Sequence, residues 1–158
     1  MKKTNAAKIT AGSLFILYAA VMLYLLLIQR FAANGFSLPR EPDYAQALLA
    51  RIEPVPFRTI VEFIGRLENF TIGDLAYRNL VGNVVLFVPI GVFLPVLFPK
   101  QRRFGMFLLT TALTITAVEL TQLFTLLGTC DIDDLILNTA GASIGYALYR
   151  LFARRKQG

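Results

Sequence analysis

The residue whose type and position most suggest chemistry is Glu119, an acid inside the apolar run 104–124. That run is long enough to cross a bilayer, because a hydrocarbon core of ~30 Å needs roughly 20 apolar residues of helix. A carboxyl group at such depth is costly, so it is kept neutral, paired with a partner, or turned toward a wet cavity. Glu119 is therefore predicted to belong to a functional site.

Further polar residues are predicted to lie at the same depth as Glu119. Asn83 lies near the start of the apolar run 80–98, and Gln122 follows Glu119 by three residues on the same helix face. A rise of ~1.5 Å per residue brings polar groups from three apolar runs to one level. We call this set the polar cluster, and it comprises Asn79, Asn83, Glu119, Gln122, Asp131, Asp134 and Asn138. Arg78 is its predicted counter-charge.

Simpler interpretations of these residues stay open at the level of sequence. The amides and Glu119 could hydrogen-bond across helices and hold a bundle together. Asp131 or Asp133 could cap the last helix, because an acid at a helix N-terminus accepts hydrogen bonds from backbone N–H groups. As hard oxygen ligands, Asp131, Asp133 and Asp134 are also weak candidates for binding Mg²⁺ or Ca²⁺. No cofactor is expected.

The composition excludes several other kinds of site. The chain has 158 residues, no histidine and a single cysteine, Cys130. Ser-His-Asp triads, Cys-His dyads and zinc sites built on histidine are therefore excluded, and one cysteine makes no internal disulfide. The 56% of hydrophobic residues exceeds the ~45–50% of ordinary soluble domains. A single membrane domain over residues 1–158 is predicted.

Four apolar runs are predicted to be transmembrane helices, which gives the fold class of an all-α membrane protein. They cover residues 11–28, 80–98, 104–124 and 134–152. The first run is longer than the ~7–15 apolar residues of a signal peptide, and no small-x-small cleavage site follows it. It is therefore predicted to be a retained transmembrane helix.

The distribution of basic residues indicates how these helices are oriented. With the N-terminus inside, ten Lys and Arg and no acid lie on the inner side. The outer side then holds six Arg, all in the loop 29–79, and nine acids. Cytoplasmic loops carry the excess of Lys and Arg, so both termini are predicted to be cytoplasmic. The net charge of +6 is thus explained by a membrane surface, and no nucleic-acid partner is expected.

The outer loop 29–79 is the one long segment outside the predicted bilayer. Its residues 56–70 place five large apolar side chains at helical spacing, with the charged residues mostly elsewhere. An amphipathic helix is predicted there, lying either on the outer membrane surface or over the mouth of the bundle.

Prolines and glycines mark two of the predicted helices. Pro89 and Pro95 interrupt the second run, which indicates either a broken helix lining a cavity or a kink that neighbouring helices tolerate. In the fourth run, Gly141 and Gly145 form a small-xxx-small pair, which lets another helix approach closely. The polar side of this helix is therefore expected to face another helix and not lipid.

Four segments of the sequence together resemble the VanZ-like family. They are VPFRTI (55–60), NLVGNVVLFVPIGVFLP (79–95), VELTQ (118–122) and DIDDLILNTAGASIGY (131–146). The resemblance covers residues 55–149 and implies a small multi-pass protein of the bacterial cell membrane. Carried over by position, the family's characteristic polar residues are the seven members of the polar cluster.

The resemblance also implies a function, since the family's namesake is associated with reduced susceptibility to teicoplanin, a lipid-tailed glycopeptide antibiotic. The first hypothesis is a non-enzymatic protein that affects how such an amphiphilic antibiotic, or a lipid-linked envelope precursor, meets the outer leaflet. The second is a metal- or carboxylate-dependent intramembrane enzyme acting on such a precursor. The third is a small transporter or flippase subunit, which requires a homo-oligomer because four helices are few for a transport path.

Overall fold

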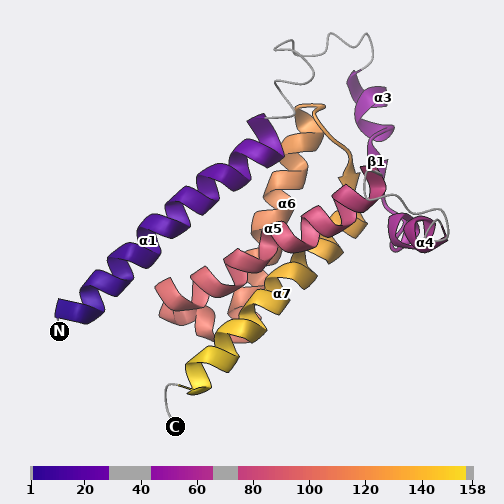
Figure 1. Cartoon of the computed structure of the whole chain (residues 1–158). Coiled ribbons are helices and arrows are strands. Elements are labelled where there is room, and N and C mark those ends of the chain that lie inside the picture. Colours follow the sequence, from indigo (N-terminus) through magenta and orange to yellow (C-terminus); the bar gives the residue numbers. More distant parts are fainter. Residues whose placement is uncertain (1, 29–43, 66–74, 156–158) are drawn as a thin grey trace.

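Runs of apolar residues form the long helices of this chain, because in lipid every backbone N–H and C=O must be paired within its own segment. The computed structural model describes residues 2–28, 44–65 and 75–155, and it is mostly helical, which confirms the predicted helical class. Its long helices are α1 (Lys2–Leu23, extended by the π-helical turn Tyr24–Ile28), α5 (Leu75–Leu97), α6 (Phe104–Phe124) and α7 (Ile132–Arg155) (Figure 1). The shorter ones are α3 (Tyr44–Leu49), α4 (Arg58–Gly65) and a 3₁₀ turn (Pro99–Arg102).

Three helical segments are long and apolar enough to cross a membrane, namely Ala6–Ile28, Leu80–Leu97 and Phe104–Phe124. They coincide with the first three predicted spans. The fourth predicted span, 134–152, is helical within α7, but α7 is not among the described segments of sufficient hydropathy. Its acidic, amide and basic side chains are the physical reason. A fourth span, the extracellular location of the loop 29–79 and the cytoplasmic location of both termini therefore stay predictions.

Two prolines lie inside α5 without ending it. Pro89 and Pro95 are internal to a helix that continues from Leu75 to Leu97. The uninterrupted helix favours the tolerated kink over a broken helix. Pro99 opens the 3₁₀ turn, where its missing N–H would have no intrahelical partner.

A short parallel sheet corrects the prediction of an all-α fold. β1 (Ile52–Glu53) pairs with β2 (Cys130–Asp131), and Cys130 N donates to Arg51 O at 2.8 Å. Two-residue strands are too short to leave an alternating pattern in a sequence, which is why the sheet was not predicted. It ties the segment after α3 to the start of α7.

The helices α5 and α7 run side by side (Figure 1), and glycines bring their backbones together. A Cβ on Gly145 would lie 1.9 Å from Val88 O, and a Cβ on Gly141 would lie 2.1 Å from Val84 O. Gly91 of α5 is equally close, because its Cβ would lie 2.0 Å from a backbone oxygen of α7. No larger residue fits at these three positions without moving a helix.

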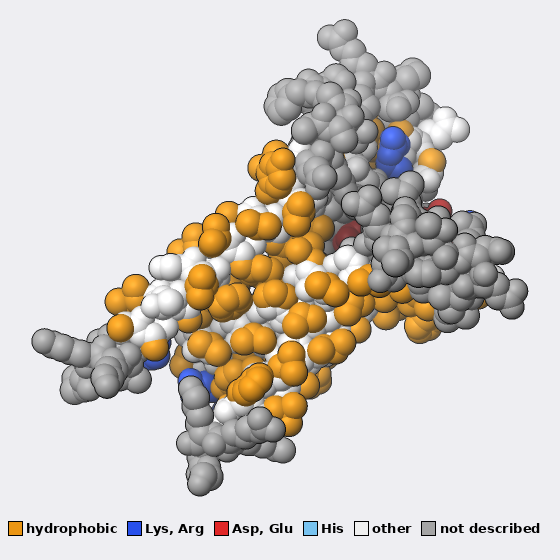
Figure 2. All heavy atoms as spheres, in the orientation of Figure 1, with side chains coloured by type: hydrophobic (Ala, Val, Ile, Leu, Met, Phe, Trp, Pro, Cys, Tyr) orange, Lys and Arg blue, Asp and Glu red, His pale blue; other side chains and the backbone are white. Residues whose placement is uncertain are grey.

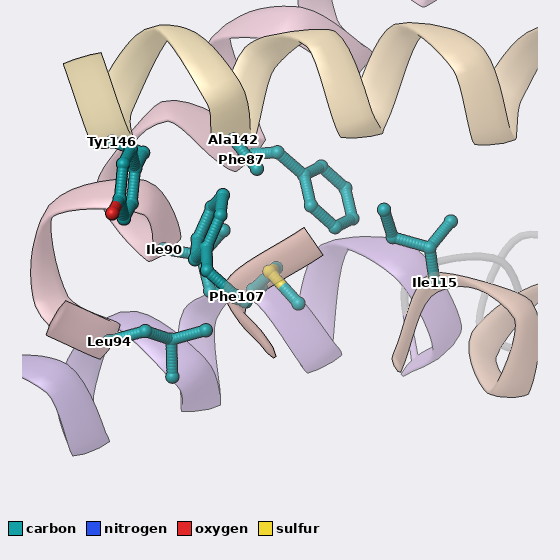
Figure 3. Packing of buried hydrophobic residues seen from close by; sticks show 8 residues of the cluster. Phe87, Ile90, Leu94, Phe107, Ile115, Ala142 and Tyr146 are labelled. Atoms are coloured by element: carbon teal, nitrogen blue, oxygen red, sulfur yellow. The ribbon is translucent and has the colours of Figure 1, made fainter. Parts of the chain in front are cut away.

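Aromatic and branched side chains fill the space between these helices (Figure 3). The Phe107 ring of α6 stacks on Tyr146 of α7 with centroids 4.7 Å apart, and Tyr146 Oη donates to Arg102 O at 2.5 Å. α1 packs on α5, where Tyr18 Oη donates to Leu86 O at 2.7 Å. The buried core is Met22, Phe87, Ile90, Leu94, Phe107, Ile115, Ala142 and Tyr146.

The outer flanks of the long helices are also apolar. Figure 2 shows hydrophobic side chains over most of the visible helix surface. Large apolar residues such as Ile16 on α1 (69% exposed), Val85 on α5 (60%) and Leu113 on α6 (62%) face outward. A surface this apolar is unfavourable in water, so it indicates that the helices are surrounded by lipid.

The predicted amphipathic helix at 56–70 corresponds to α4, which is shorter, with eight residues. It begins after Phe57, whose φ of 65° lies in the left-handed region. Phe57 and Val61 are exposed, whereas Ile60 is half-buried. Residues 66–70 of the predicted helix lie outside the described ranges.

Candidate functional site

Five members of the polar cluster are buried within the helices α5, α6 and α7. Their exposed fractions are 9% for Asn83, 6% for Glu119, 2% for Gln122, 7% for Asp134 and 3% for Asn138. Polar side chains that faced lipid would be costly, so their burial against neighbouring helices is the arrangement that a membrane favours. The structure thus places these five residues inside the bundle and away from its apolar flanks.

A direct contact joins two of these helices. Asn83 Nδ2 of α5 donates to Asp134 Oδ1 of α7. A hydrogen bond to a charged group contributes ~1.5–3 kcal/mol. Asp134 is therefore held at the α5–α7 contact, on the same side as the glycines that bring the two helices together.

Gln122 connects α6 to the first span. Its Nε2 donates to Leu26 O at 2.9 Å, within the π-helical turn that ends α1. The last carbonyls of a helix have no intrahelical partner, and the Gln122 amide supplies one. Gln122 thus holds the helix ends together, the role described above as a hydrogen bond across helices.

Asp131 and Asp133 act as helix caps. Asp131 lies in β2, one residue before α7, and its Oδ1 accepts from Asp133 N at 2.8 Å, which caps α7. Its Oδ2 accepts from Thr59 Oγ1 at 3.0 Å. Asp131 thus precedes α7, whereas Asp134 and Asn138 of the polar cluster lie within it.

Asp133 caps a different helix, α4, through hydrogen bonds to residues 73 to 76 positions earlier in the chain. Its carboxylate accepts from Phe57 N, from Thr59 N at 2.8 Å and from Ile60 N at 3.4 Å. These are backbone donors that the first turn of α4 leaves without intrahelical partners. Asp133 is fully buried, so it fixes α4 to the start of α7 and holds the left-handed Phe57 in place.

The three weak candidates for metal ligands are directed to separate partners. Asp131 binds Thr59, Asp133 binds the backbone of α4, and Asp134 binds Asn83. Within residues 2–28, 44–65 and 75–155, no three His, Cys, Asp or Glu side chains form a group that could hold a metal ion. The structure therefore does not bring this acidic set together as a metal centre.

The remaining predicted residues are less informative. Arg78 and Asn79 lie in the first turns of α5, but their side chains are outside the described ones, so the counter-charge role of Arg78 stays a prediction. Asn138 is placed among the buried residues of α7, and its Oδ1 has no hydrogen-bond partner among the described atoms. An unsatisfied buried acceptor costs ~1–3 kcal/mol.

Two adjacent hollows open beside Glu119 and the caps. The apolar hollow, about 250 Å³ in volume, is lined by α6, α7 and both strands; its lining includes Glu53, Glu119, Cys130, Asp131, Ile132 and Leu135. The polar hollow, about 170 Å³, is lined by Glu53, Val55, Arg58, Thr59, Glu62 and Asp131. Because Glu53 and Asp131 line both, the two hollows share a border.

Charges at these hollows come partly from residues that the sequence did not single out. Arg58 Nη1 forms an ion pair with Glu53 at 2.7 Å, and its Nε forms a second with Glu62 at 3.3 Å. Burial raises the pKa of the Cys130 thiol, and the carboxylates of Glu119, Asp131 and Asp134 raise it further. The Arg58–Glu62 pair is a local i,i+4 contact on a helix, whereas the approach of Glu53 to Asp131 depends on the pairing of β1 with β2.

Comparison with known proteins identifies the family. The model of the VanZ/LLP1 family matches residues 15–153, which begins in α1 and so extends beyond the 55–149 region of the resemblance. Protein VanZ of Enterococcus faecium is 35% identical over 75 residues, which are 48% of this chain and 46% of that protein. The match thus covers less than half of that relative, and no solved structure matches the chain. Since the family match covers most of its length, the chain belongs to the VanZ-like family.

Proposed function

We propose that this chain is a multi-pass protein of the bacterial cell membrane that lowers susceptibility to lipid-tailed glycopeptide antibiotics of the teicoplanin type, or serves a related envelope process at the outer leaflet. The observation that carries the proposal is the site itself: α5, α6 and α7 each bury polar residues, and one of these, Glu119 of α6, lines an apolar hollow together with residues of α7. Membership in the VanZ-like family supports it. The proposed partners are the bilayer and an amphiphilic antibiotic or lipid-linked precursor.

Orientation is the second part of the proposal. α7 has 24 residues, which at ~1.5 Å per residue gives about 36 Å, enough for a hydrocarbon core of ~30 Å. Its polar and glycine face packs on α5, so α7 can serve as a fourth span despite its lower hydropathy. The exposed bases Lys100, Arg102 and Arg103 lie between α5 and α6, at the ends of these helices remote from Asp134. Because the cytoplasmic side carries the excess of bases, we infer that the polar cluster lies on the outer side.

An outward site suits the proposed task. Teicoplanin acts outside the membrane, close to the lipid surface, and carries an acyl tail beside a polar body. The apolar hollow and its carboxyl groups would meet such a molecule at the depth where its tail enters the bilayer. Among the described residues no arrangement favours the enzyme or the transporter, and neither is proposed.

Antibiotic susceptibility tests the proposal. A teicoplanin-sensitive Gram-positive host would express the wild-type chain, Glu119→Gln or no protein, with the membrane level of each measured. We expect the wild type to raise the inhibitory concentration of teicoplanin and to leave that of vancomycin, which lacks the acyl tail, unchanged. Glu119→Gln should lose the protection. Equal susceptibility of wild-type and empty cells at good expression would overturn the role in antibiotic susceptibility.

A further inference from the structure

The apolar hollow combines an apolar wall with carboxyl groups. Ile132 and Leu135 of α7 supply apolar surface, while Glu119 of α6, Glu53 of β1 and Asp131 of β2 line the same space. Of the described residues that line it, none is Lys or Arg. An apolar space with acids and no base favours a ligand that is apolar along its length and positively charged at one end.

The size of the hollow limits what it can hold. Pockets for whole drug-sized ligands have volumes of ~300–1,000 Å³, and this hollow has about 250 Å³. It therefore accommodates a segment of one alkyl chain and not a whole glycopeptide. The polar hollow beyond Glu53 and Asp131 adds about 170 Å³ for a head group.

Charge decides where the head group lies. In the polar hollow the described base is Arg58, which is already ion-paired with Glu53 and Glu62. Asp131 lines both hollows at their border, and its hydrogen bonds come from a backbone N–H and the Thr59 hydroxyl, which are uncharged donors. An ammonium group at this border would meet the Asp131 carboxylate, whose described donors are uncharged, and the Glu53 carboxylate, which it would share with Arg58.

We propose that the apolar hollow binds the alkyl chain of an amphiphile that carries a protonated amine. Glu53 and Asp131 hold the amine at the border of the two hollows, and Glu119 adds a carboxyl group from the wall of the apolar hollow. The ligand enters from the bilayer, where its chain is dissolved. This inference rests on the proposed function and deepens it, since it names the charged class of amphiphile and the residues that select it.

Cys130 provides a direct assay, because it is the only cysteine of the chain and lines the apolar hollow. The full chain would be placed in phosphatidylcholine nanodiscs, and the rate of Cys130 alkylation by N-ethylmaleimide would be measured. Three probes that share one alkyl chain length and differ in charge would be compared: dodecylammonium, uncharged dodecanol and anionic dodecanoate. We expect dodecylammonium to slow alkylation about tenfold or more at saturation, and the other two to leave the rate nearly unchanged.

Two kinds of variant make the assay specific. The double variant Thr129→Cys, Cys130→Ser moves the thiol to an exposed position that does not line the apolar hollow. Dodecylammonium should not protect this thiol. A cation that only accumulated at the bilayer surface would favour the thiolate and speed alkylation. Binding in the hollow is expected to slow alkylation instead. Glu119→Gln and Glu53→Gln should each raise the dodecylammonium concentration needed for protection about tenfold. Glu53 is partly exposed, so its variant keeps the test valid where Glu119→Gln does not fold.

The outcomes separate this inference from the proposed function. Equal protection by all three probes, or full protection in both glutamine variants, would overturn selection of the amine. Absence of protection by dodecylammonium in a chain that still confers teicoplanin tolerance would overturn the inference alone. Protection by dodecylammonium in a chain that confers no tolerance would support the inference and overturn the role in antibiotic susceptibility.

Discussion

Replacing Gly145 with alanine probes how closely α5 and α7 approach each other. The added Cβ would lie 1.9 Å from Val88 O, whereas an ordinary contact begins at 3.4 Å. To restore an ordinary contact, the helices must separate by roughly 1.5 Å at this point. A gap of ~0.5–1 Å between packed atoms already removes a quarter to a half of the dispersion energy of each contact. Overpacking costs ~1–3 kcal/mol. We expect the upper part of this range, because the obstacle is backbone and cannot rotate away.

Thermal unfolding of the purified chain in one detergent, followed by circular dichroism, measures this effect. At ~2–4 °C per kcal/mol for a chain of this size, Gly145→Ala should lower the midpoint by roughly 5–10 °C. The matched control is Gly82→Ala, in which the same methyl group is added to α5 and meets nothing within 4 Å. Its midpoint should equal or exceed that of the wild type, since alanine is favoured over glycine in a helix by ~1 kcal/mol.

Equal midpoints for the two variants would refute the close approach of α5 and α7, because both carry the same added group. The same conclusion would follow if Gly82→Ala were the more destabilised of the two. An intermediate result at Gly145 can be resolved with Gly141→Ala, where the Cβ would lie 2.1 Å from Val84 O. Its midpoint should fall by a similar amount.

Three further predictions concern the polar contacts. Asp133→Ala removes the cap of α4, which should cost ~1–2 kcal/mol and speed hydrogen exchange of the α4 amides while exchange in α6 stays unchanged; unchanged exchange in α4 would contradict the cap. Single and double alanine variants of Asn83 and Asp134 should give a coupling energy of ~1.5–3 kcal/mol in a double-mutant cycle, and additive effects would show that the two side chains do not interact. The pKa of Cys130 is raised by burial and nearby carboxylates. The alkylation rate of Cys130 should therefore rise at higher pH than that of the exposed thiol in the double variant Thr129→Cys, Cys130→Ser. Identical pH profiles of alkylation for the two thiols would contradict the burial and the negative charge described around Cys130.

Much of the helical fold could be predicted from residue patterns. The run 104–124 has the same bounds as α6, and the run 80–98 lies within one residue of the apolar segment Leu80–Leu97 of α5. Such runs are readable because a membrane requires about 20 consecutive apolar residues. α7 is different: its helicity was predicted, but Asp134 and Asn138 lower its hydropathy, and packing on α5 compensates for them.

Contacts between distant segments could not be predicted in the same way. Asp133 could be recognised as a cap by its position before a helix, but its partner is α4, far away in the chain. The border of the two hollows depends on the pairing of Glu53 with Asp131 in strands of two residues. These contacts depend on the register of segments joined by long connections, which no local period encodes.

The central claim is that the polar cluster and the hollows face the outside of the cell. It is tested most directly by labelling intact cells with a membrane-impermeant maleimide, using Thr129→Cys with Cys130→Ser, whose exposed thiol lies beside the site. The matched control is Lys100→Cys with Cys130→Ser, at an exposed position between α5 and α6. We predict that position 129 is labelled in intact cells and position 100 only after permeabilisation. Labelling of position 100 alone in intact cells would place the site in the cytoplasm and contradict an action on antibiotics at the outer leaflet.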